Sequence, residues 1–85
     1  MSLEDRSGRI RHDSARPIWQ QVSDDLAAEI ASGALPPDTR LPSEAELSSQ
    51  YGVARVSVRR AIADLRSKGL VVTVHGRGSY TAERP

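Results

Sequence analysis

The chain has 85 residues, of which 38% are apolar, and a net charge of only +1, so it allows one small domain with a thin core. It has no cysteine, which excludes disulfides and leaves only His12 and His75 as nitrogen ligands, so we expect neither a metal nor a cofactor. No apolar run approaches the span of a membrane and nothing resembles a signal peptide, so we expect a cytoplasmic protein with no membrane partner.

Residues 1 to 16 offer little apolar surface around which to fold. Their basic residues alternate with acidic ones, the basic set being Arg6, Arg9, Arg11 and Arg16 and the acidic set Glu4, Asp5 and Asp13. This composition predicts a disordered segment. A mobile terminus explains it better than an arm that follows a DNA backbone.

A first helix is predicted from Pro17 to about Ser32 and Gly33, because proline is favoured in a first helical turn. Its apolar stripe repeats every fourth residue and consists of Ile18, Val22, Leu26 and Ile30, with Trp19 beside it. We interpret this helix as scaffold. Residues 35 to 38 predict a stiff turn, and residues 39 to 41 a short strand beside a later hairpin.

A short second helix is predicted to begin after Ser43. The Ser43 side chain can cap it, and Glu46 three residues later can return a bond to the Ser43 backbone N–H. Leu47 and Tyr51 give it an apolar edge, and Gly52 ends it because glycine tolerates the left-handed conformation.

The third helix, predicted over about residues 54 to 68, has apolar residues at i, i+3, i+4 and i+7, namely Val58, Ala61, Ile62 and Leu65. Arg55, Arg59 and Arg66 form a stripe beside them, and Val56 and Arg60 lie further round, so the outer face is cationic. Such a helix can enter the major groove of DNA, where arginine binds guanine or phosphate. Taken alone, this face is better explained as a solvated surface, but the neighbouring elements favour DNA.

A β-hairpin is predicted over residues 70 to 82. The run from Leu70 to Val74 is rich in β-branched residues, a turn follows at residues 75 to 78, and residues 79 to 81 return. The second and third predicted helices, joined by the turn at Gly52, form a helix-turn-helix. A hairpin that follows the basic helix of such a motif is called a wing, and Arg77 between two glycines could enter a minor groove. An ordinary polar turn is the alternative interpretation of residues 75 to 78 when they are considered alone.

The charge of the chain is divided between two regions. Residues 52 to 80 carry six basic side chains and one acidic one, a net charge of +5. Residues 17 to 51 carry one basic side chain and six acidic ones, a net charge of −5. We therefore expect one side of the molecule to attract phosphate and the other to repel it.

Seven motifs in order resemble the DNA-binding domain of GntR-family bacterial transcription regulators over about residues 17 to 82. They are Pro17-Ile18-Trp19, Gly33-x-Leu35-Pro36-Pro37, Arg40-Leu41-Pro42-Ser43-Glu44, Tyr51-Gly52-Val53, Val58-Arg59-Arg60-Ala61, Gly69-Leu70-Val71 and Gly76-Arg77-Gly78. The resemblance implies an α+β fold, a winged helix-turn-helix with three helices and a C-terminal hairpin. It also implies a homodimer on a palindromic operator of double-stranded DNA, usually repressing transcription.

The resemblance also implies which residues contact DNA. Family arginines matching Arg55 and Arg59 contact bases or phosphates, and wing residues matching positions 75 to 78 approach the minor groove. We predict a site made of Ser43, Glu44, Ala54, Arg55, Val56, Ser57, Arg59, Arg60, His75, Gly76, Arg77 and Gly78. Family members normally carry a C-terminal domain that senses a small-molecule effector and dimerises. The chain is therefore either a fragment or a small stand-alone DNA-binding domain; we expect a fragment, in which residues 83 to 85 are a tail.

Three positions depart from the family pattern. Ala45 stands where arginine is frequent, so one expected DNA contact is missing. Ala54 and Val56 stand where serine or threonine is frequent, which weakens the cap of the third helix, although Val56 could touch a thymine methyl. The sequence preference should therefore differ from that of relatives that keep these residues.

Two other classes of function compete with DNA binding. A winged helix can serve as a protein-interaction module without specific DNA binding, with the wing and Trp19 as its surface. An enzyme is disfavoured because adjacent acids on a helix do not face one another, His75 has no orienting partner in sequence, and Ser43 reads as a cap.

Overall fold

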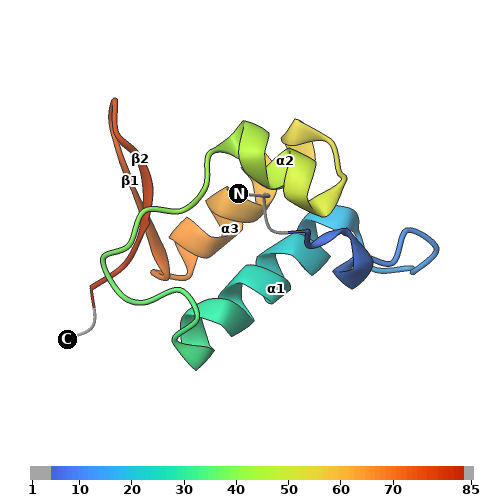
Figure 1. Ribbon diagram of the computed structural model, residues 1–85, viewed down its shortest axis with the longest axis horizontal. Coiled ribbons are helices and arrows are strands. Elements are labelled where there is room, and N and C mark those ends of the chain that lie inside the picture. Colours follow the sequence, from blue (N-terminus) through green and yellow to red (C-terminus); the bar gives the residue numbers. More distant parts are fainter. Residues whose placement is uncertain (1–4, 84–85) are drawn as a thin grey trace.

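The computed structural model describes residues 5 to 83. A 3-10 turn η1 (Ser7–Arg9) precedes three helices, α1 (Ile18–Ser32), α2 (Glu44–Tyr51) and α3 (Arg55–Ser67), and two strands, β1 (Val71–Val74) and β2 (Gly78–Thr81). The helices gather on one side and the hairpin projects from the other end (Figure 1). Three helices followed by a hairpin confirm the predicted architecture. Among the described helices, none combines the length and the apolar character needed to span a bilayer.

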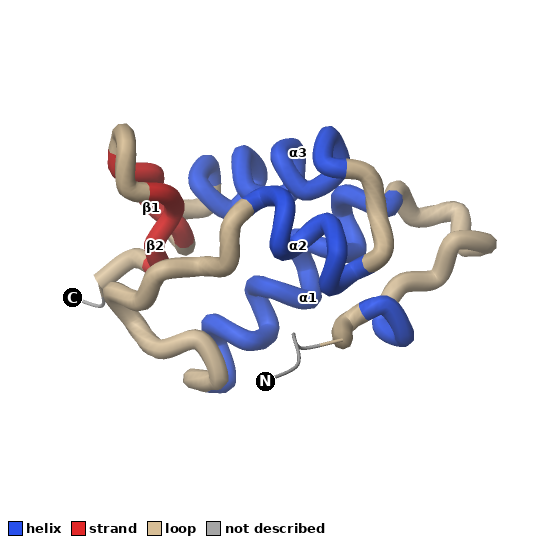
Figure 2. The backbone as a smooth tube through the Cα atoms, turned by 45° about the horizontal axis from the view of Figure 1, so that its top comes forward, coloured by secondary structure: helices blue, strands red, loops and turns tan. Residues whose placement is uncertain are grey.

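The core lies where α1 and α3 pack together, and α2 closes its side. Figure 2 shows α1 beneath α3 along much of its length. Val22 and Leu26 of α1 meet Val58, Ala61 and Leu65 of α3, and all five are fully buried. Full burial of an aliphatic side chain stabilises the fold by about 1.5–3 kcal/mol. The apolar stripes predicted for these helices therefore face each other.

The predicted helix ends are also present. The Ser43 hydroxyl accepts a hydrogen bond from the Glu46 backbone N–H at 3.0 Å, and the Glu46 carboxylate accepts one from the Ser43 N–H at 2.8 Å. Gly52 ends α2 with a φ of 69°, in the left-handed region. Pro17 precedes the first helical residue of α1 instead of forming part of its first turn.

The hairpin is antiparallel, with Val71 opposite Thr81 and Val74 opposite Gly78. The segment before α2 runs along β2, because Leu41 donates its N–H to the Ser79 carbonyl at 2.8 Å and Arg40 bridges to Tyr80. The predicted short strand is thus a single bridge. It ties the start of α2 to the hairpin.

The disorder predicted for residues 1 to 16 is wrong for the described part of that segment, residues 5 to 16. Arg6 and Ile10 are buried, and the Arg6 backbone N–H donates to the Gln50 carbonyl at 2.8 Å. The Arg6 guanidinium bonds Gln50 at 2.8 Å, pairs with Glu29 and lies over the Tyr51 ring. A charged segment can dock when its charges meet buried partners, which the composition alone does not reveal. Residues 1 to 4 lie outside the described part of the chain.

Candidate nucleic-acid interface

The outer surface of α3 presents most of the predicted site residues. Arg55, Arg59 and Arg60 are exposed, and Val56 is 64% exposed, a large fraction for an aliphatic side chain. Ala54 precedes the helix in extended conformation and provides no side-chain cap. The Arg55 and Val56 N–H groups in the first turn of α3 are therefore not occupied by a capping side chain and can donate to an anion, whereas the Ser57 N–H donates to the Ala54 carbonyl at 3.0 Å.

Arg59 is held by a carboxylate from the neighbouring helix. Its Nε and Nη2 donate to the two oxygens of Glu44 at 3.1 and 2.7 Å, a bidentate pair. These hydrogen bonds lower the pKa of Glu44 and raise that of Arg59. The pair is solvated, since the Arg59 side chain is 66% exposed and the Glu44 side chain 36% exposed. Arg59 thus lies on the predicted DNA-binding face of α3, but its guanidinium is already paired with the Glu44 carboxylate.

Arg60 lies on another flank of α3. Its guanidinium stacks over the Trp19 ring, 4.4 Å from the ring centroid. Trp19 belongs to the first turn of α1, so this arginine points toward α1 and away from Glu44. A planar guanidinium on an aromatic face keeps its edge N–H groups free for a phosphate.

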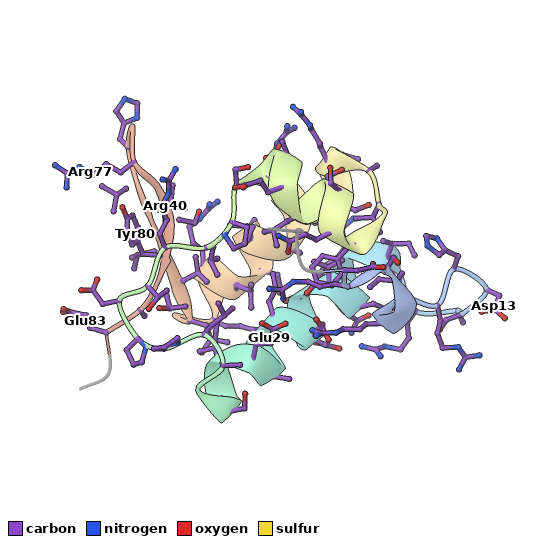
Figure 3. The ribbon with its side chains drawn as sticks, viewed as in Figure 1. Asp13, Glu29, Arg40, Arg77, Tyr80 and Glu83 are labelled. Atoms are coloured by element: carbon purple, nitrogen blue, oxygen red, sulfur yellow. The ribbon has the colours of Figure 1, made fainter. Side chains whose placement is uncertain are left out.

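The turn of the hairpin is exposed from His75 to Gly78. Gly76 and Gly78 have φ values of 77° and 111°, which L side chains rarely adopt, so both positions favour glycine. Figure 3 shows Arg77 extending away from the helices. Arg77 shares a shallow surface pocket with Val72, Val74 and Tyr80. The structure therefore places Arg77 on the outer face of the hairpin and does not bring it to the arginines of α3.

Two arginines that we did not predict as site residues lie on the inner face of the hairpin. A Cβ built on Gly78 would be 3.2 Å from Nε of Arg40, so the Arg40 guanidinium lies against the hairpin backbone. Arg66 donates to the Thr73 hydroxyl at 3.1 Å. The predicted strand at residues 39 to 41 was the available signal for Arg40, because it places this residue beside the wing.

Ser43 and Ser57 complete the surface. Ser43 begins α2 and its hydroxyl oxygen is occupied by the capping box, although the hydroxyl proton can still be donated. Ser57 is half-buried in the first turn of α3. The structure thus groups the start of α2, the exposed face of α3 and the inner face of the hairpin.

Known proteins with this arrangement were found by sequence and by structure. The family described as "Bacterial regulatory proteins, gntR family" matches residues 18–81. The HTH-type transcriptional repressor NagR of Bacillus subtilis is 38% identical over 74 residues, which cover 87% of this chain and 30% of NagR. The histidine utilization repressor of Pseudomonas aeruginosa is 43% identical over 67 residues, which cover 79% of this chain and 27% of that repressor. The chain thus spans less than a third of the length of these relatives.

Two solved structures are similar over most of the chain. That of AraR(DBD) in complex with operator ORE1 is 37% identical with a TM-score of 0.77, covering 86% of this chain and 89% of that one. YtrA from Sulfolobus acidocaldarius, a GntR-family transcription factor, is 34% identical with a TM-score of 0.82, covering 89% of this chain and 80% of YtrA. With the family match over residues 18–81, these likenesses show that the chain belongs to the gntR family of bacterial regulatory proteins and has its winged helix fold.

Proposed function

We propose that this chain is the DNA-binding domain of a cytoplasmic transcription repressor that recognises a double-stranded operator. The observation that carries the proposal is the exposed cationic surface on α3, with Arg55, Arg59 and Arg60 in its first two turns. A helix fits the major groove, and arginine reads guanine there by paired hydrogen bonds. The named repressors among its relatives and the operator complex of AraR(DBD) support the same function.

In this arrangement, α3 occupies the major groove and the hairpin reaches an adjacent minor groove. Arg77 leaves the hairpin near its tip on the outer face, where it can enter a narrow minor groove or bind a flanking phosphate. Exposed Val56 can pack on a thymine methyl group. Arg55 and Arg59 supply the donors for base edges.

We further propose that the operator is palindromic and is bound by a homodimer, with half-sites about 10–10.5 base pairs apart or a multiple of this. One domain of this size offers a small interface, and a second copy supplies affinity. A small-molecule effector would act on a region outside these residues, as expected for regulators of which this chain spans less than a third.

The test begins with a selection of bound duplexes from a random pool, followed by fluorescence anisotropy on the enriched sequence. We expect the Arg55→Ala and Arg59→Ala variants each to lose about 1–3 kcal/mol of specific binding and to change the preferred bases. Arg11→Ala is the matched control, because Arg11 is 75% exposed and lies in the segment before α1. The proposal fails if no sequence is enriched, or if both α3 variants bind the enriched duplex as tightly as the parent.

A further inference from the structure

A hollow of about 280 Å³ lies between the start of α2, the outer face of α3 and the inner face of the hairpin. Three guanidinium groups from two segments line it: Arg40 before α2, and Arg59 and Arg66 in α3, with Arg66 in the last turn of that helix. One carboxylate, that of Glu44, shares this lining. The hollow therefore has an excess of two positive charges.

Only one of these three cations is neutralised by an ion pair. Glu44 holds Arg59. Arg66 donates to a neutral hydroxyl, that of Thr73, and the Arg40 guanidinium lies against Gly78, which has no side chain. Within residues 5 to 83, neither Arg40 nor Arg66 lies within ion-pair distance of a carboxylate. Both retain N–H donors and positive charge for an external anion.

The position of the hollow indicates which anion. In B-DNA, a single sugar-phosphate strand separates a major groove from the adjacent minor groove. A protein with α3 in the major groove and the hairpin at the minor groove must therefore cross that strand between the two elements. The hollow lies between those same two elements.

We infer that the hollow binds one backbone phosphate of the DNA strand between the two grooves, an inference that rests on the proposed function. Arg40 and Arg66 donate to this phosphate from opposite sides, and the Ser79 hydroxyl, which lies 3.1 Å from that of Thr73 and can accept its proton, provides one further donor. Arginine and phosphate form strong charge-assisted hydrogen bonds. The contact reads no base, but it fixes the helix and the hairpin in one register on the duplex.

The first test measures the salt dependence of binding for Arg40→Ala, Arg66→Ala and the double variant. Each single variant should weaken binding to operator and to random duplex alike, by about tenfold for a lost charge-assisted bond. Because both arginines hold the same phosphate, the double variant should flatten the slope of log K against log salt by about 0.9, the value for one phosphate. Unchanged affinity and slope in the double variant, with a parent that still binds its operator, would overturn this inference and leave the proposed function intact. A parent that selects no operator would instead overturn the proposed function.

A structural role for Arg66 is tested by Thr73→Val, which removes the Arg66 hydrogen bond to the hairpin but keeps the arginine. Thr73→Val should preserve most of the affinity and the full salt slope. If Thr73→Val weakens binding to operator and to random duplex as much as Arg66→Ala does, Arg66 only supports the hairpin, and the inference is overturned.

The second test locates the phosphate on the DNA. Neutral methylphosphonates are placed one at a time along each operator strand, and affinity is measured for the parent and for the double variant. A methylphosphonate at one position of the strand between the two grooves should weaken DNA binding by the parent. The same methylphosphonate should not weaken DNA binding by the double variant any further. Additive losses at every position would refute a shared phosphate.

A final arm separates DNA from a free anion. Arginine Nε–H resonances of Arg40 and Arg66 are followed by NMR during titration with operator, and with inorganic phosphate at constant ionic strength. Operator should shift both, and millimolar phosphate should shift neither. Equal shifts with inorganic phosphate alone would overturn the assignment to a DNA strand.

Discussion

Replacing Arg6 by alanine should destabilise the domain, although Arg6 is not one of the apolar core residues. The Arg6 side chain is 3% exposed, bonds Gln50 at 2.8 Å, pairs with Glu29 and lies 5.6 Å from the centre of the Tyr51 ring. These contacts attach the segment before α1 to both α1 and α2. Arg6→Ala removes all of them and leaves a cavity beside Tyr51.

The expected cost follows from those contacts. Breaking a buried ion pair costs about 3–5 kcal/mol when the remaining charge has no partner. Here the Glu29 carboxylate still receives a hydrogen bond from Arg9 at 2.6 Å, so it is not orphaned and the cost is smaller. Hydrogen bonds to charged groups at about 1.5–3 kcal/mol, together with a cation–π contact of about 0.5–1 kcal/mol, give a loss of about 2–4 kcal/mol.

Urea denaturation followed by circular dichroism measures this loss. A domain of 85 residues has a total stability of about 4–13 kcal/mol, so the midpoint should move visibly. In thermal melts each kcal/mol lowers Tm by about 4–8 °C in a domain of this size. Arg11→Ala, on an exposed side chain in the same segment, should change the free energy of unfolding by less than about 0.5 kcal/mol. If Arg6→Ala melts like Arg11→Ala, residues before α1 do not contribute to the fold, and the reasoning is refuted.

Three further outcomes are expected. Ser43→Ala should cost about 1 kcal/mol of unfolding free energy because it removes the cap of α2, whereas Ser49→Ala on the exposed face of that helix should cost almost nothing; equal losses by urea denaturation would contradict the capping role. Burial first, and then a hydrogen bond to a carboxylate of α1, raise the pKa of Tyr51 above its ordinary value of about 10. The stability that its protonated hydroxyl supplies is therefore present below pH 10 and lost as pH rises above it. The parent should exceed Tyr51→Phe in free energy of unfolding below pH 10 and lose this advantage above it. A constant difference in free energy of unfolding across that range would count against this prediction. Glu44→Gln should release Arg59 and strengthen binding to random duplex with a salt slope steeper by about 0.9; the reverse change, measured by anisotropy, would show that Glu44 assists binding instead of competing for Arg59.

The helices could be predicted because their signals are local. The Ser43 cap and its partner are three residues apart, Gly52 marks the end of α2 by its own conformational freedom, and Val58 and Leu65 repeat at helical spacing. Each signal depends only on neighbours along the chain, so the sequence displays it directly.

The pairings of the site could not be predicted in the same way. Arg59 meets Glu44 across 15 residues, and Arg60 meets Trp19 because α3 crosses α1. These contacts depend on how the helices pack, which helical periodicity does not specify. The burial of Arg6 could not be predicted for a related reason: a charged residue near a terminus is expected to be solvated unless its buried partners are known.

The stacking of Arg60 on Trp19 also gives the protein a built-in optical reporter. Trp19 is the only tryptophan in the sequence, so all of the tryptophan emission of the chain arises beside one flank of α3. An event that draws the guanidinium off the indole ring changes the surroundings of this single fluorophore. Occupancy of that flank can therefore be followed in unlabelled protein, one ligand addition at a time.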